Sequence, residues 1–217
     1  MKVFSKKFVQ SALIGFFLLF LIYLTREVLE RETSNVDTTV YNFMISFRSS
    51  HLTFIMIAIS FIGEQIAVLM AVLLILFYIL KRKFMDGLLT FLAIFLASTV
   101  TYFLKIITAR SRPDMMFRLA TENNFSFPSG HATIAFTVYP ILLIMFWRSM
   151  QSKGKSMSVL TYILVGILTL IPILVGISRL YLGVHFFSDV LAGTIIGLFF
   201  SYLFAITSKH SIYSKTN

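Results

Sequence analysis

Several residue types are scarce in this sequence, and each scarcity excludes a class of protein. The chain has no cysteine, which excludes disulfide scaffolds, thiolate nucleophiles and zinc sites built on sulfur. Charged residues make up 13% of the 217 residues, about half the roughly 25% of a soluble domain. There are only nine acidic residues against 19 Lys and Arg, and they form no carboxylate cluster of the kind that holds Mg²⁺. We therefore expect no cofactor and no bound metal.

What the sequence has in abundance is apolar. Hydrophobic residues make up 58% of the chain, 24 of them Phe, and the mean hydropathy is +0.87. Runs long enough to cross a bilayer alternate with short polar segments. We predict an all-α polytopic membrane helix bundle, a single domain over 1–217. Its six transmembrane helices are expected near 8–24, 65–80, 85–107, 128–147, 159–177 and 185–206.

Two further segments are harder to assign. Between 25 and 51 a capping pattern, Ser34-x-x-Asp37, precedes four apolar residues on one helical face: Val36, Val40, Phe43 and Phe47. This pattern predicts an interfacial helix near 35–48, although a solvated loop would also fit. Residues 52–62 are expected to dip into the membrane interface or pack beside the second span. Glu64 breaks the apolar run after them, and we interpret it as a water-exposed helix end rather than a site residue.

Charge predicts the orientation of the bundle. The N-terminus, the 81–83 turn, the 148–158 loop and the C-terminal tail hold 11 of the 19 basic residues but only one acid, a net charge of +10. In the remaining segments eight basic and eight acidic residues cancel. By the positive-inside rule both termini are cytoplasmic. The positive charge then reflects topology, and nucleic-acid binding is not needed to explain it.

Ionisable residues also occur inside apolar sequence, where they are costly and by default indicate a functional site. The stretch 178–189 contains Arg179, His185 and Asp189. If 185–189 is helical, the imidazole and the carboxylate share a face. The carboxylate can then hold one imidazole nitrogen as a donor and leave the other free to attack. A buried His–Asp pair that merely satisfies itself is the alternative.

Two earlier stretches have the same character. Lys105 and Arg112 are seven residues apart and would share a face if the helix persists. The alternative is that the two side chains are interfacial anchors. Ser129, Gly130 and His131 follow a proline at a predicted helix start. There the first-turn N–H groups favour an anion, and glycine lets the backbone approach it closely. A helix cap with an incidental histidine is the simpler alternative.

In the predicted topology these stretches meet at the outward ends of the spans. Three cations around a helix N-terminus make a cradle for phosphate. Two histidines beside it suit phosphoryl transfer, because one can attack phosphorus while the other protonates the leaving oxygen. Arginine and lysine can stabilise the charge on the equatorial oxygens. We therefore expect metal-independent phosphoryl transfer.

The three stretches, in this order, resemble the three-part signature of the type 2 phosphatidic acid phosphatase (PAP2) family. Its membrane members are lipid phosphatases with six spans, and its soluble relatives include vanadium haloperoxidases. Residues 125–131 and 176–193 are most similar to bacterial phosphatidylglycerophosphate phosphatases of Bacillus type. The resemblance implies that His185 is the nucleophile, Asp189 its orienting partner and His131 the acid. It also implies five phosphate-binding residues: Lys105, Arg112, Ser129, Gly130 and Arg179.

The expected function is hydrolysis of a membrane lipid phosphate on the outer face of a bacterial plasma membrane, by a monomer in the bilayer. Phosphatidylglycerophosphate is the favoured substrate, with undecaprenyl diphosphate and phosphatidate as alternatives. Other possibilities are a non-catalytic phosphate-lipid binder or transporter, a vanadate-dependent oxidase and a purely structural membrane protein. In the outward loop we interpret Asp114 and Glu122 as solvated acids. Gly193-x-x-x-Gly197 indicates close helix packing, more often within a bundle than between copies.

Overall fold

The computed structural model describes residues 5–152 and 158–213, and these are helical with no strands. The basic residues Lys2, Lys153, Lys155 and Lys215, which contribute to the charge argument, lie outside the described residues. The helices are α1 (Lys6–Leu29), α2 (Ser34–Ser46), α3 (Ser50–Phe61), α4 (Ala67–Leu80), α5 (Phe84–Thr108), α6 (Gly130–Ser152), α7 (Val159–Tyr181) and α8 (Phe187–Tyr213). A π-helical turn, η1 (Ile62–Ile66), joins α3 to α4, and a short 3₁₀ turn, η2 (Met115–Phe117), lies in the loop before α6.

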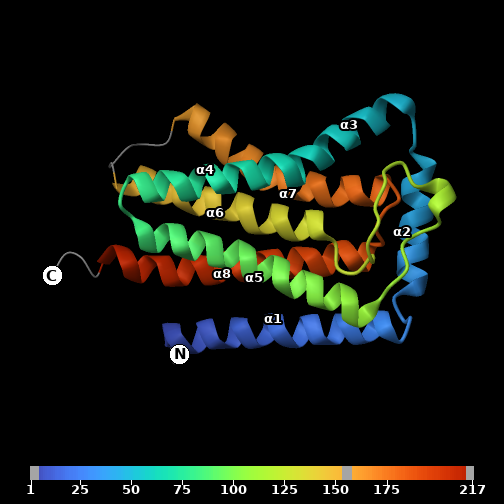
Figure 1. Cartoon of the computed structure of the whole chain (residues 1–217), viewed down its shortest axis with the longest axis horizontal. Coiled ribbons are helices and arrows are strands. Elements are labelled where there is room, and N and C mark those ends of the chain that lie inside the picture. The colour runs from blue at the N-terminus through green and yellow to red at the C-terminus, as the bar shows by residue number, and fades with distance from the viewer. Residues whose placement is uncertain (1–4, 153–157, 214–217) are drawn as a thin grey trace.

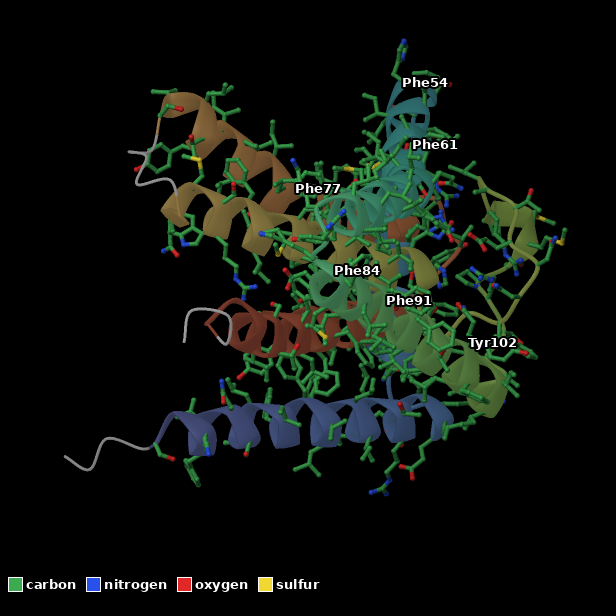
Figure 2. The ribbon with its side chains drawn as sticks, turned by 60° about the vertical axis from the view of Figure 1, so that its left-hand side comes forward. Phe54, Phe61, Phe77, Phe84, Phe91 and Tyr102 are labelled. Atoms are coloured by element: carbon green, nitrogen blue, oxygen red, sulfur yellow. The ribbon has the colours of Figure 1, made fainter. Side chains whose placement is uncertain are left out.

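Within the described residues, six helical segments are long and apolar enough to cross a membrane, as predicted. Consecutive spans run in opposite directions, and α2 lies across one end of the bundle (Figure 1). The outward faces are apolar. Figure 2 labels six exposed aromatic side chains along α3, α4 and α5, among them Phe54 at 76% and Phe84 at 61% exposed. In lipid these faces are buried, so the protein is a multi-pass membrane protein.

The predicted boundary of the second span is wrong. Residues 52–62 are not a separate segment packed beside the span, because Ser50–Leu80 is one helical segment of 31 residues. The π turn absorbs the polar residues without breaking the helix, since its backbone remains hydrogen-bonded. Hydropathy registers a polar interruption but cannot distinguish a helix end from a helix bulge.

The predicted interfacial helix exists as α2, but its apolar residues do not all face the same way. Val40 packs inward against a cluster of Ala132, Leu180 and Val190. Phe43 and Phe47, which stack edge to face with their ring centroids 4.8 Å apart, are more than half exposed.

Among the described helices, α6 and α8 make the most extensive contact, and glycine lets their backbones approach closely. A Cβ at Gly193 would lie 2.5 Å from the Ser129 carbonyl oxygen, and one at Gly197 would lie 2.7 Å from the Thr133 oxygen. The Gly193-x-x-x-Gly197 pattern therefore serves packing within the bundle. It holds the start of α8 against the start of α6, where the Ser129 N–H also donates to the Asp189 carbonyl at 2.9 Å.

Candidate active site

The three ionisable stretches meet at the end of the bundle that α2 crosses. α5 ends there, α6 and α8 begin there, and the loop between α5 and α6 folds over them (Figure 1). α5 ends at Thr108, close to the predicted end of the span, because Ala109 adopts a left-handed conformation with φ 44°, so the helix does not persist to Arg112. Arg112 therefore lies beyond the helix and does not share a helical face with Lys105, yet the loop returns it to the same place.

His185 and Asp189 form a buried pair. His185 Nδ1 lies 3.4 Å from Asp189 Oδ2, with 2% of the histidine and none of the aspartate exposed. The predicted reason for their meeting is wrong, because His185 lies in the turn before α8 rather than inside the helix. The aspartate instead folds back over the helix start, where Oδ2 accepts the Phe186 N–H at 2.8 Å.

The neighbours of His185 assign its tautomer. Arg112 Nη1 lies 3.1 Å from Nε2, and a guanidinium can only donate, so Nε2 must be the unprotonated nitrogen. The ring proton is then on Nδ1, facing Asp189. Burial lowers the pKa of His185 from 6.5 to about 3, more than the adjacent carboxylate raises it. The imidazole is therefore neutral at pH 7, with a lone pair on the nitrogen that faces Arg112.

Asp189 is held by two more side chains, and neither of them was singled out from the sequence. Ser126 Oγ donates to Oδ2 at 2.5 Å, and Arg110 Nη1 donates to Oδ1 at 2.5 Å. The second guanidinium nitrogen of Arg110 donates to Asp37 Oδ2 at 2.6 Å. Asp37 comes from α2 and is 1% exposed, so α2 is joined to the His185–Asp189 pair by a buried ionic chain.

Asp37 also organises the start of α8. Its two carboxylate oxygens accept the backbone N–H of Ser188 at 2.9 Å and the Ser188 hydroxyl at 2.7 Å. A carboxylate at a helix N-terminus is favourable, because it satisfies a free N–H and meets the positive end of the helix dipole. The capping pattern that predicted α2 therefore contains a residue that caps another helix.

The expectation that Glu122 is a solvated acid is wrong. Its side chain is 18% exposed and lies between Arg112, 3.3 Å away, and Arg179, with which it forms an ion pair. Its Oε1 is also 3.9 Å from His131 Nδ1. A carboxylate therefore occupies the space that two arginines and an imidazole surround, and an anion is stable there.

The interpretation of Glu64 as a solvated helix end is also wrong. The π turn places its carboxylate 2.8 Å from His131 Nε2, at the inner side of the site. Ser60, one turn earlier in α3, accepts from Arg179 Nη1 at 2.5 Å. The second span therefore contributes to the site, although none of the three sequence stretches includes it. The signal was present in the sequence, since Glu64 is the only acid in the apolar run 52–80.

The remaining predicted residues lie in the same region. Lys105 is buried and donates to the carbonyl oxygens of Phe125 at 2.5 Å and Ser126 at 3.3 Å, which holds the loop in place. A Cβ added to Gly130 would meet nothing within 4 Å. Among the described residues, Ser129 Oγ and Arg179 Nε are buried without a partner. Unpaired buried polar atoms are costly, so both favour a ligand that completes them.

Taken together, the fold and the site define an integral membrane phosphatase: a bundle of apolar spans with two imidazoles, two arginines and a lysine gathered at one end. The PAP2 superfamily pattern matches residues 86–212, more than half of the chain. The chain therefore belongs to the PAP2 superfamily, and it is a hydrolase of phosphoric esters.

Two relatives support this assignment at the level of sequence. The chain is 35% identical over 196 residues to phosphatidylglycerophosphatase B of Bacillus subtilis (strain 168), covering 88% of this chain and 91% of that protein. It is 33% identical over 157 residues to a PA-phosphatase related-family protein of Dictyostelium discoideum, covering 64% of this chain and 56% of that protein.

Two solved structures resemble this one. The transmembrane PAP2-type phosphatidylglycerolphosphate phosphatase from Bacillus subtilis superposes with a TM-score of 0.79 at 28% identity, over 94% of this chain and 98% of that one. Aquifex aeolicus LpxE superposes with a TM-score of 0.60 at 25% identity, over 78% of this chain and 94% of that one. The similarity thus extends over the whole bundle, including the spans before residue 86.

Proposed function

We propose that this protein removes phosphate from a membrane lipid by way of a phosphohistidine at His185, without a metal ion. The observation that carries the proposal is the position of the Glu122 carboxylate. An anionic group is already surrounded by Arg112, Arg179 and His131, with His185 beside Arg112. A phosphate that displaces this carboxylate would lie between the two imidazoles.

In the first step His185 Nε2 attacks phosphorus, forming a P–N bond as the P–O bond to the lipid breaks. His131 Nδ1 gives its proton to the leaving lipid oxygen. The Nδ1–H of His185 faces Asp189, so the positive charge that develops on the ring meets a carboxylate.

In the second step water attacks the phosphohistidine, the P–N bond breaks and Nε2 regains its lone pair. His131, now neutral, accepts the proton from the attacking water. Arg112 and Arg179 stabilise the charge on the phosphoryl oxygens, and so does Lys105, whose ammonium has one N–H left after its two bonds to the loop. These cations supply the charge stabilisation that a metal ion gives in many other phosphoryl-transfer enzymes.

The favoured substrate is phosphatidylglycerophosphate. Support comes from the Bacillus subtilis relative of that name, which aligns over most of both chains. Undecaprenyl diphosphate and phosphatidate remain alternatives, because the residues described above contact phosphate and do not read the rest of a headgroup.

The site is proposed to face away from the cytoplasm. The basic 81–83 turn and Arg148 lie at the opposite end of the bundle, where α4 and α6 end and α5 begins (Figure 1). By the positive-inside rule that end is cytoplasmic. The site, at the other end, would then meet lipids in the outer leaflet.

The test is phosphate release by the purified protein, with EDTA present, from phosphatidylglycerophosphate, undecaprenyl diphosphate and phosphatidate. The proposal predicts release from at least one lipid, fastest from phosphatidylglycerophosphate, and none from the His185→Ala variant. A wild-type protein that binds these lipids but releases no phosphate would instead be a binder or transporter. Activity that disappears with EDTA and returns with a divalent metal would contradict the metal-free mechanism.

A further inference from the structure

Glu64 stands apart from the residues that the PAP2 signature explains. It lies in the second span, outside the matched region 86–212, in a segment that is otherwise apolar. Its carboxylate is 39% exposed and ends 2.8 Å from His131 Nε2. An ionisable group inside an apolar span with a histidine as its partner calls for a functional explanation.

Among the described residues, the backbone is π-helical only at this contact. Neighbouring helices hold the π turn in place. The π turn Ile62–Ile66 shifts the helix so that Glu64 faces inward, and the Tyr139 hydroxyl donates to the Ile62 carbonyl at 2.9 Å. Gly63 fits against α7, since a Cβ there would lie 2.4 Å from a methyl carbon of Val175. Single π turns inside α-helices occur frequently at functional sites, because they redirect one side chain.

The contact decides which nitrogen of His131 faces the substrate. With Nε2 committed to Glu64, Nδ1 is the nitrogen that points toward the Glu122 carboxylate, 3.9 Å away, in the proposed phosphate position. A neutral His131 with its proton on Nε2 has no proton on Nδ1 to give. The acid step therefore requires both ring nitrogens to carry a proton, with Nε2–H held by the Glu64 carboxylate.

We propose that Glu64 is a positioning residue that holds His131 through Nε2, so that Nδ1 carries the proton given to the leaving lipid oxygen and later takes a proton from water. This role rests on the proposed function. It places a Glu–His pair on the acid side of the phosphate, opposite the Asp–His pair on the nucleophile side.

The other charges around His131 come from four elements. Glu122 faces it from the loop before α6, and its charge is shared by Arg112 and Arg179. Arg179 of α7 and Lys105 of α5 act electrostatically on Glu64. From the start of α8, Asp189 is engaged by Arg110 and His185. Among the described residues, Glu64 is therefore the carboxylate within hydrogen-bond distance of His131, whereas Glu122 stands 3.9 Å away.

The experiment compares wild type with Glu64→Gln on two substrates, the best lipid substrate and p-nitrophenyl phosphate. An alkoxide needs a proton as it leaves, whereas p-nitrophenolate leaves readily without one. The proposal predicts that the first-turnover rate, measured by rapid quench, falls by about 10- to 100-fold on the lipid, up to the lower end of what a general acid contributes, and much less on the aryl ester. The first turnover is the readout because the later hydrolysis of the phosphohistidine is common to both substrates.

Gln65→Ala is the matched control, since it changes an exposed residue of the same π turn and should behave as wild type. Equal losses in first-turnover rate on both substrates would show a merely structural role and overturn the proposal, as would a fully active Glu64→Gln. If wild type released phosphate from no substrate, the proposed function itself would fail. If the wild type is active and Glu64→Gln is equally active, only the role of Glu64 would be overturned.

Discussion

The two histidines of the site are held in contrasting ways. His185 lies in a turn where it and Asp189 are almost fully buried, and the aspartate is fixed by a serine, a backbone N–H and Arg110. His131 is held at the start of a helix by one carboxylate, and that carboxylate is 39% exposed. A nucleophile benefits from being fixed and dehydrated, whereas an acid must exchange protons with water in every turnover. Both histidines are buried, and the contrast in exposure of their carboxylate partners fits the contrast in proposed role.

The largest effect should follow from disrupting the buried His185–Asp189 pair. Asp189→Asn removes the carboxylate that fixes the Nδ1–H tautomer and stabilises the charged ring. We expect kcat to fall by about 10²- to 10⁴-fold, as for the loss of the aspartate in a Ser-His-Asp triad, with little change in KM. Steady-state kinetics on the lipid substrate measure this. Asp114→Asn, at an exposed acid that caps the 3₁₀ turn, is the control, and a fully active Asp189→Asn would remove the orienting role.

A smaller effect should follow from removing the residue that holds Asp189 in place. Arg110→Gln leaves Asp189 without its guanidinium partner. We expect kcat to fall by about 10- to 100-fold, which is the usual loss when a residue that orients a metal ligand is mutated. Asp37→Asn should act through the same chain and add little in the Arg110→Gln background, because the two residues share one network. Full additivity in the double-mutant cycle would contradict the connection to α2. Arg26→Gln, which breaks an exposed pair, should be silent.

The pH dependence of the first step tests the buried state of His185 directly. A histidine with a pKa near 6.5 would have about 30-fold less neutral imidazole at pH 5 than at high pH. Because burial lowers the pKa of His185 to about 3, its neutral form persists down to about pH 4. Rapid-quench measurement of the first turnover should therefore show no acid limb between pH 7 and pH 5. A limb near 6.5 would mean that His185 is hydrated in the working enzyme.

The smallest effect concerns α2, which joins the buried side of the site to the membrane surface. Replacing the exposed Phe43 and Phe47 together by Ser should raise KM for lipid by roughly three- to tenfold, corresponding to about 1 kcal/mol of lost apolar burial. KM for p-nitrophenyl phosphate should not change. Exposed Val159 and Leu160, at the other end of the bundle, provide a matched double Ser control. Equal changes on both substrates would mean that α2 does not guide lipid.

The number of spans could be predicted from the sequence, because a bilayer requires long apolar helices and leaves few alternatives. The path through Gly63 and Glu64 could not, since a bulge and a break have the same hydropathy. The difference lies in the contacts of Tyr139 and Val175 with the turn, which are made across the bundle. A local pattern contains no information about such contacts.

The eight predicted site residues lie at one end of the bundle, although their roles stay predictions. Residues that belong to a spaced motif could be predicted from the sequence. Arg110 lies between Lys105 and Arg112, and no spacing distinguished it from its neighbours. Asp37 was noticed only as a possible cap. Glu64 and Glu122 were taken as solvated, because a lone acid is usually exposed and its partners come from other helices.

The most direct test of the account is to trap the phosphoenzyme. Substrate labelled with ³²P in its terminal phosphate is mixed with the protein and quenched in alkali, where phosphohistidine is stable, and the labelled peptide is sequenced. The account predicts label on His185 in the wild-type protein and none in His185→Ala. Turnover by the wild-type protein without any trapped label, or label that persists in His185→Ala, would contradict it.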